Sequence, residues 1–128
     1  MLDAKKLHVV VVDDSTPVRE TLVLVLELQG IATIGLATAE AAIAHITGHP
    51  TDVLLCDIQL PGPGVNGIQA ALEIAKVAPD CRVLLMSGDS TSSVLLDGAR
   101  KSGHEFEVIA KPFGPEELFA ILNKTASP

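Results

Sequence analysis

The sequence is poor in aromatic residues and cysteine. Aromatics make up 2% of 128 residues and neither Trp nor Tyr occurs, so a core must be built from Val, Leu, Ile and Ala. The two cysteines, Cys56 and Cys81, lie inside apolar runs, a placement that favours buried reduced thiols over a disulfide or a metal site. No apolar run approaches the length of a membrane span. No secretory signal is visible either, so we expect a cytoplasmic protein without membrane contact.

The sequence also lacks an excess of positive charge. Lys and Arg number 9 against 16 Asp and Glu, which gives a formal net charge of −7. Nucleic-acid phosphates require a positive protein face, so direct nucleic-acid binding is not expected. The length and the 48% hydrophobic content suit one domain over residues 1–128 with an aliphatic core.

What the sequence has is an alternation of short apolar runs with segments of helical period. Near-continuous apolar runs are typical of parallel strands that are covered on both faces. The candidate strands are Leu7–Val12, Ile31–Ala37, Asp52–Cys56, Cys81–Met86 and Phe106–Ala110. Five such βα units with right-handed crossovers predict a doubly wound, five-stranded parallel sheet in the order 2-1-3-4-5, with helices on both sides.

The candidate helices are marked by their ends and by their apolar spacing. Ser15 is a possible N-cap for the first, and Gly30 would end it. Apolar residues at helical spacing predict the buried face of the third, at Ile68, Ala71, Leu72, Ala75 and Ala78. The candidate helices are Ser15–Gln29, Ala39–Thr47, Asn66–Ala78, Thr91–Ser102 and Pro115–Lys124.

Polar residues stand where these strands end, which is where doubly wound sheets bind ligands. Asp13 and Asp14 follow the first strand and Asp57 follows the third, so three carboxylates would converge if those strands are neighbours. Their repulsion favours a cation among them, and oxygen ligands favour Mg²⁺ or Ca²⁺ over zinc. A Mg²⁺ ion that accepts a phosphate oxygen fits well. Ser87 and Lys111, at the ends of the fourth and fifth strands, would hold the other phosphate oxygens.

Over nearly its whole length the sequence resembles the receiver domain of bacterial two-component response regulators. Each matching motif alone is weak evidence for this family, whereas the whole set in this order and spacing is strong evidence. The motifs are Val9–Val12 followed by Asp13-Asp14-Ser15, Leu54–Asp57 with Pro61-Gly62 behind it, Met86-Ser87-Gly88, and Lys111-Pro112-Phe113.

The resemblance implies a flavodoxin-like fold and a phosphorylation-dependent signalling switch. In that family the residue matching Asp57 accepts a phosphoryl group from a histidine kinase. The positions matching Asp13 and Asp14 hold Mg²⁺, together with the Asp57 carboxylate and the backbone carbonyl of the position matching Gln59. Such a domain is not an enzyme beyond catalysing its own phosphorylation and dephosphorylation.

The resemblance also assigns roles around the new phosphoryl group. The hydroxyl of Ser87 would bond to it, Lys111 would form an ion pair with it, and the Lys111–Pro112 peptide bond is expected to be cis. The implied partners are a histidine kinase or phosphotransfer protein and a downstream effector protein or domain. The family's output and dimer surface corresponds roughly to Thr91–Lys124. This segment is poor in basic residues, so a homodimer held by many ion pairs across that surface is poorly supported. The chain could be free-standing or cut from a longer multidomain regulator or hybrid kinase.

Two features depart from the family pattern. The segment after the phospho-acceptor contains two extra residues before Asn66-Gly67, so the loop around Gly62–Val65 is longer; it is either a tolerated insertion or a change in kinase docking or phosphoryl lifetime. Val108 stands where many receivers carry Tyr or Phe, whose ring rotates on activation. Either signalling runs through loop shifts alone, or the mechanism based on a rotating aromatic ring does not apply here, or Val108 only packs in the core.

Three other functions are alternatives to the switch. An aspartyl-nucleophile phosphatase needs a second Asp two residues after the nucleophile, where Gln59 stands. A nucleotide or flavin binder needs a glycine-rich loop after the first strand, where the sequence is acidic. A degenerate receiver that acts as a phosphorylation-independent scaffold stays open because of the altered loop and Val108.

Overall fold

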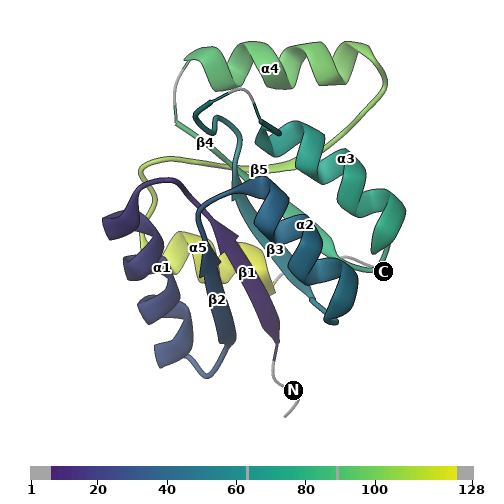
Figure 1. The fold of residues 1–128 in the computed structure, drawn as a ribbon. Helices are drawn as coiled ribbons and strands as arrows, with labels where there is room; N and C mark the ends of the chain where they lie inside the picture. Colours follow the sequence, from purple (N-terminus) through teal and green to yellow (C-terminus); the bar gives the residue numbers. More distant parts are fainter. Residues whose placement is uncertain (1–6, 63, 89, 124–128) are drawn as a thin grey trace.

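The computed structural model describes residues 7–62, 64–88 and 90–123. Its elements alternate strictly between strand and helix along the chain (Figure 1). They are β1 (His8–Val12), α1 (Thr16–Leu28), β2 (Ala32–Leu36), α2 (Ala39–Gly48), β3 (Val53–Asp57), α3 (Gly67–Val77), β4 (Arg82–Ser87), α4 (Ser90–Lys101), β5 (Glu107–Ala110) and α5 (Pro115–Asn123). The strands form one parallel sheet in the order β2-β1-β3-β4-β5, which confirms the predicted doubly wound, flavodoxin-like fold.

Both faces of the sheet are buried, and successive residues of a strand enter opposite layers. Val9 and Val11 of β1 pack in the cluster that α1 and α5 cover through residues such as Leu26 and Leu118. Val10 and the other alternate strand residues pack in the cluster on the side of α2, α3 and α4. This alternation follows from the two-residue period of a strand, and the double cover explains why the strand sequences are almost wholly apolar.

The predicted helix ends are close to those observed. The Ser15 side chain accepts a hydrogen bond from the Val18 N–H and caps α1, and Gly30, at φ +82°, follows the helix as predicted. Asn66 is the N-cap of α3, where it forms a capping box with Gln69. The predicted end of α5, Lys124, lies outside the described residues.

The predicted buried face of α3 is partly wrong. Ile68 and Ala71 are buried, but Ala75 is exposed, and the buried stripe runs instead through Ala70 and Ile74. The helix packs against α2 as well as against the sheet, so the stripe it buries is wider and is centred about one residue earlier.

Both cysteines are free and buried, as predicted. Burial raises the pKa of the Cys56 thiol to about 12 and that of the Cys81 thiol to about 11, so both are protonated at neutral pH. Within the described part of the chain, no helix has the length and apolar character needed to cross a membrane.

Candidate functional site

The polar residues singled out in the sequence meet at the carboxyl edge of the sheet. Asp13 and Asp14 follow β1, while Asp57 is the last residue of β3 and Ser87 the last of β4. Lys111 follows β5, and its backbone N–H donates to the Ser87 carbonyl at 2.8 Å. The edge forms because the strands are parallel and because β3 lies between β1 and β4.

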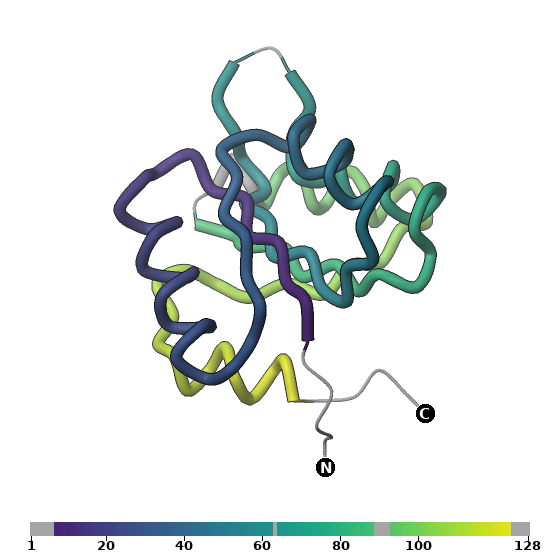
Figure 2. Tube along the Cα trace, turned by 60° about the horizontal axis from the view of Figure 1, so that its bottom comes forward, coloured from purple at the N-terminus to yellow at the C-terminus, as the bar shows by residue number. Residues whose placement is uncertain are grey.

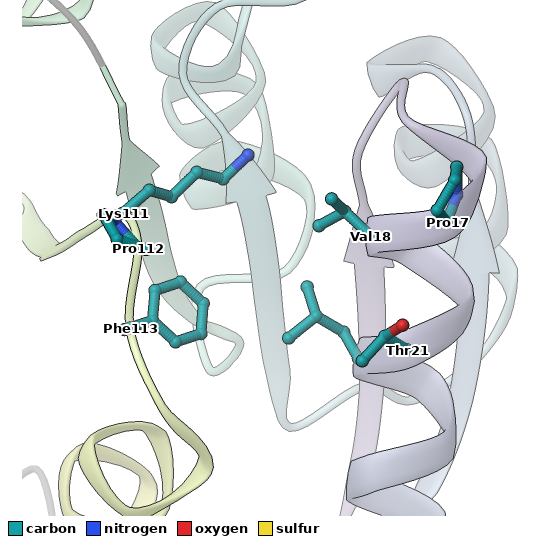
Figure 3. A pocket seen from close by; sticks show the side chains of 7 residues that line it. Pro17, Val18, Thr21, Lys111, Pro112 and Phe113 are labelled. Atoms are coloured by element: carbon teal, nitrogen blue, oxygen red, sulfur yellow. The ribbon is translucent and has the colours of Figure 1, made fainter.

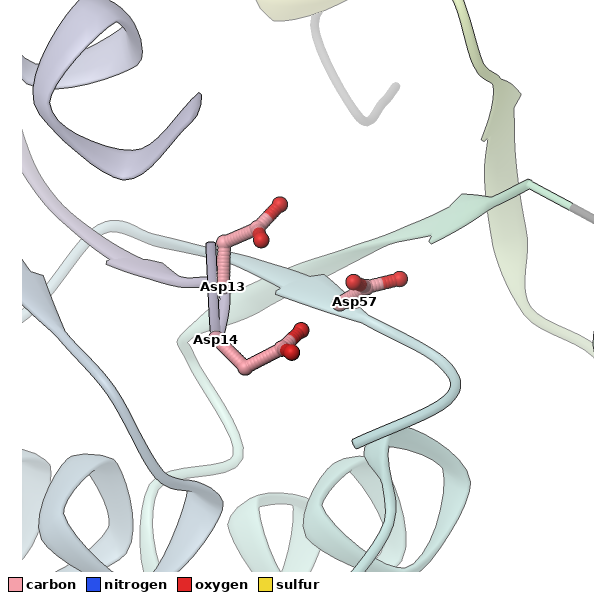
Figure 4. A group of neighbouring side chains, drawn as sticks. All are labelled: Asp13, Asp14 and Asp57. Atoms are coloured by element: carbon pink, nitrogen blue, oxygen red, sulfur yellow. The ribbon is translucent and has the colours of Figure 1, made fainter. Parts of the chain in front are cut away.

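Three carboxylates form a compact cluster at this edge (Figure 4). One carboxylate oxygen each from Asp13, Asp14 and Asp57 lies within 4.8 Å of the others. Asp13 and Asp57 are buried, with 1% and 8% of their surface exposed, whereas Asp14 is exposed. The site is therefore open on the side of Asp14 and closed beneath by the apolar ends of the strands.

Asp13 is held in place by its neighbours along the chain. Its Oδ1 atom accepts the N–H of Ser15 at 2.9 Å, and its backbone carbonyl accepts the Arg19 guanidinium at 2.8 Å. Both contacts tie the end of β1 to the first turn of α1. The sequence alone does not distinguish Arg19, since an arginine in a first helical turn looks like a solvated side chain.

Lys111 reaches across the edge to two of the carboxylates. Its Nζ atom donates to Asp13 Oδ2 at 2.9 Å and to Asp57 Oδ2 at 3.2 Å. Partial burial lowers the pKa of Lys111, but the hydrogen bond to Asp13 and the charge of Asp57 outweigh this effect and raise it above its ordinary value. The side chain is therefore a cation at neutral pH. The Lys111–Pro112 peptide bond is cis, as the resemblance implied.

Asp57 carries a carboxylate that its surroundings only partly stabilise. Burial raises the pKa of Asp57 most; the charge of Lys111 lowers it, and the charges of Asp13 and Asp14 raise it further, with a net rise. A divalent cation would relieve this repulsion. Carboxylate oxygens are the donors that Mg²⁺ prefers, so the three side chains fit this ion.

The remaining predicted positions lie around this cluster. Gln59 is exposed on the loop two residues beyond Asp57, and Ser87 is half-buried at the end of β4. Val108 lies on β5 opposite Leu85 and packs, half-buried, against the cluster on the α2–α4 side of the sheet. This placement gives Val108 a packing role.

An apolar cleft of about 390 Å³ is lined in part by Lys111 (Figure 3). It lies between the first turns of α1 and the segment that follows β5. Its lining consists of Pro17, Val18, Thr21 and Leu22 on one side and Lys111–Phe113 on the other. Lys111 lines the cleft and also donates to Asp13 and Asp57, so it connects the cleft with the cluster.

Comparison with known proteins gives a consistent family. A family model described as the response regulator receiver domain matches residues 9–123. The chemotaxis protein CheY of Thermotoga maritima is 28% identical over 120 residues, which cover 93% of this chain and 97% of that protein. The phosphate regulon transcriptional regulatory protein PhoB of Pseudomonas aeruginosa is 28% identical over 116 residues, which cover 89% of this chain and 49% of that protein.

Solved structures show the same fold. A two component transcriptional regulator AraC from Clostridium phytofermentans superimposes with a TM-score of 0.73 and 28% identity, over 91% of this chain and 89% of that one. A CheY-like receiver domain protein from Methanospirillum hungatei gives a TM-score of 0.78 at 24% identity, over 92% and 91% of the two chains. This chain thus spans nearly all of some relatives and about half or less of others, such as the C4-dicarboxylate transport transcriptional regulatory protein DctD of Rhizobium meliloti, of which it spans 23%.

Proposed function

The chain belongs to the family of response regulator receiver domains, and from this premise we propose that it is a cytoplasmic signalling switch whose phospho-acceptor is Asp57. Membership makes it the receiver domain of a two-component response regulator, with a phosphorylation-dependent signalling role. The observation that supports Asp57 as the acceptor is its position within a cluster of two further carboxylates and one lysine at the carboxyl edge of the sheet.

The proposed reaction is the transfer of a phosphoryl group from a phosphohistidine to the Asp57 carboxylate. An Asp57 oxygen attacks the phosphorus, the new P–O bond forms as the P–N bond breaks, and the electron pair leaves on the histidine nitrogen. Lys111, which lies 3.2 Å from an Asp57 oxygen, would neutralise part of the added phosphoryl charge. Ser87, on the neighbouring strand, would donate its hydroxyl to a phosphoryl oxygen.

The cation in this proposal is Mg²⁺. Asp13, Asp14 and Asp57 would hold it with their carboxylates, and the family resemblance adds the backbone carbonyl of Gln59. When bound, Mg²⁺ offsets the negative charge of the site and gives the phosphoryl oxygens a positive partner. Lys111, which donates to Asp57 Oδ2 at 3.2 Å, would help to orient the Asp57 carboxylate for attack. Self-catalysed phosphorylation and dephosphorylation would be the only enzymatic activity of the domain.

The proposed partners are proteins. A histidine kinase or phosphotransfer protein would supply the phosphoryl group, and the apolar cleft beside Lys111 offers such a donor a contact next to Asp57. Output would pass through α4, β5 and α5 to an effector protein or an attached domain, with a homodimer on the same face as an option. Since relatives such as PhoB are about twice as long, DNA binding in this system would belong to another domain.

Intact mass after incubation with acetyl phosphate and Mg²⁺ tests the proposal. The wild-type chain should gain one phosphate, and it should not do so without Mg²⁺ or after Asp57→Asn. Asp80→Asn, which changes an exposed Asp in a turn away from the cluster, is the matched control and should gain phosphate like wild type. Absence of any gain in wild type would favour the scaffold role instead.

A further inference from the structure

The loop that joins β3 to α3 is fixed at its base to the backbone of the phospho-acceptor. Ile58, next to Asp57, is fully buried and donates its N–H to the Met86 carbonyl at 3.0 Å. The Gly67 N–H, at the start of α3, donates to the Ile58 carbonyl at 2.8 Å. A Cβ atom on Gly67 would overlap the Asp57 carbonyl oxygen, so the two backbones are in direct contact. Both ends of the loop are therefore held against the backbone of the acceptor.

The same loop is also held to α2, at Val65, two residues before the start of α3. The Val65 N–H donates to Glu40 Oε2 at 3.0 Å, and Glu40 lies in the first turn of α2. A Cβ atom on Gly64 would overlap that same oxygen, so the glycine leaves the space that the Glu40 carboxylate fills. Val65 itself is half-buried against the core on that side of the sheet. The described parts of the loop, on either side of residue 63, extend from the carboxyl edge beside the start of α2 (Figure 2).

The charge state of Glu40 suits this contact. The hydrogen bond from the Val65 backbone lowers the pKa of Glu40 below its ordinary value, so the carboxylate form is the acceptor at neutral pH. The cap of α2 is supplied by Thr38, whose hydroxyl accepts the Ala41 N–H at 3.1 Å. Thr38, and not Glu40, is thus the N-cap residue, and the Glu40 carboxylate accepts the N–H of Val65 in the loop.

We propose that Glu40 is a positioning residue for the phospho-acceptor site. Glu40 holds the lengthened loop, which carries Gln59, in the conformation that binds the cation. The inference rests on the proposed function. A loop held in its binding conformation has less conformational entropy to lose when its carbonyl joins a cation, so affinity is higher. Glu40 does not belong to the carboxylate cluster and acts only through the loop.

The test measures the Mg²⁺ dissociation constant of the whole chain by calorimetry and the hydrogen exchange of the Val65 amide. Glu40→Ala should weaken Mg²⁺ binding roughly threefold, as expected for one lost hydrogen bond, and speed exchange at Val65. Glu40→Gln keeps an acceptor oxygen and should restore both values, although it removes the same charge. Glu116→Ala removes an exposed first-turn acid from α5 and should match wild type in both.

Three outcomes would overturn the inference while leaving the proposed function intact. They are wild-type Mg²⁺ affinity in Glu40→Ala, an equal loss in Glu40→Gln, and an equal loss in Glu116→Ala, since the last two would indicate a general effect of charge. A wild-type chain that does not bind Mg²⁺ at all would instead overturn the proposed function, and the positioning role with it.

Discussion

Replacing Asp57 with Asn should stabilise the protein in the absence of Mg²⁺. At the 4.8 Å limit of the cluster, two unit charges repel by about 3 kcal/mol at an effective dielectric constant of 20 and by about 1 kcal/mol in water. Asp57 faces two such repulsions, from Asp13 and Asp14. One attraction, to Lys111 at 3.2 Å, opposes them; it amounts to about 5 kcal/mol at the dielectric constant of 20 and about 1 kcal/mol in water. The balance predicts a gain of about 1 kcal/mol from the substitution, while Lys111 keeps its partner Asp13.

Urea unfolding followed by far-ultraviolet circular dichroism measures this gain, since the chain has no Trp or Tyr for fluorescence. In thermal unfolding the same gain corresponds to about 4 °C. Mg²⁺ at ten times its dissociation constant should stabilise wild type by about 1.4 kcal/mol and Asp57→Asn by much less. The reasoning is refuted if the substitution destabilises the apoprotein and leaves the response to Mg²⁺ unchanged.

The pH dependence of stability provides a second view of the same carboxylate. The pKa of Asp57 is raised above its unfolded value of 3.8, so the folded state binds this proton more tightly than the unfolded state does. The contribution of Asp57 to stability must then fall as pH rises from 3.8 through the folded pKa. In apoprotein, Asp57→Asn should remove this fall, so the two stability curves should converge at low pH and separate as pH rises.

The sheet could be predicted because its signals are local. Each strand is a short run of β-branched and aliphatic residues, and each run ends at a polar residue that the parallel arrangement brings to one edge. The errors at the ends are small and have a structural cause. The predicted range Asp52–Cys56 stops one residue short of the end of β3, because the backbone of Asp57, predicted to end this strand, is still in register with Met86 of β4.

Contacts that charged side chains make with residues distant in the sequence could not be predicted in this way. Glu40 and Val65 are 25 residues apart, and Glu40 alone resembles any acid in a first helical turn. Arg82 likewise looks like a solvated residue at the start of a strand, yet it bonds Glu107 and the end of α5. Such pairs depend on how elements pack, a level that hydrophobic periodicity does not encode.

Two further substitutions test contacts that support the site. Arg82→Ala removes hydrogen bonds to Glu107 at 2.6 Å and to an α5 carbonyl at 2.9 Å, and should lower the free energy of unfolding in urea by about 1–3 kcal/mol. Glu107→Gln changes only a half-exposed partner and should lower it less. Equal losses of stability in the two variants would contradict a role for the α5 contact. Gly67→Ala places a methyl group against the Asp57 carbonyl oxygen and the Ile58 Cα, which are backbone atoms that cannot turn aside. The start of α3 must then move away from the acceptor, at a cost of about 1–3 kcal/mol and with a weaker stabilisation by Mg²⁺. Gly48→Ala, where a Cβ meets nothing within 4 Å, is the control and should lose neither. Wild-type stability and Mg²⁺ response in Gly67→Ala would mean that the helix start and the acceptor backbone are not in contact.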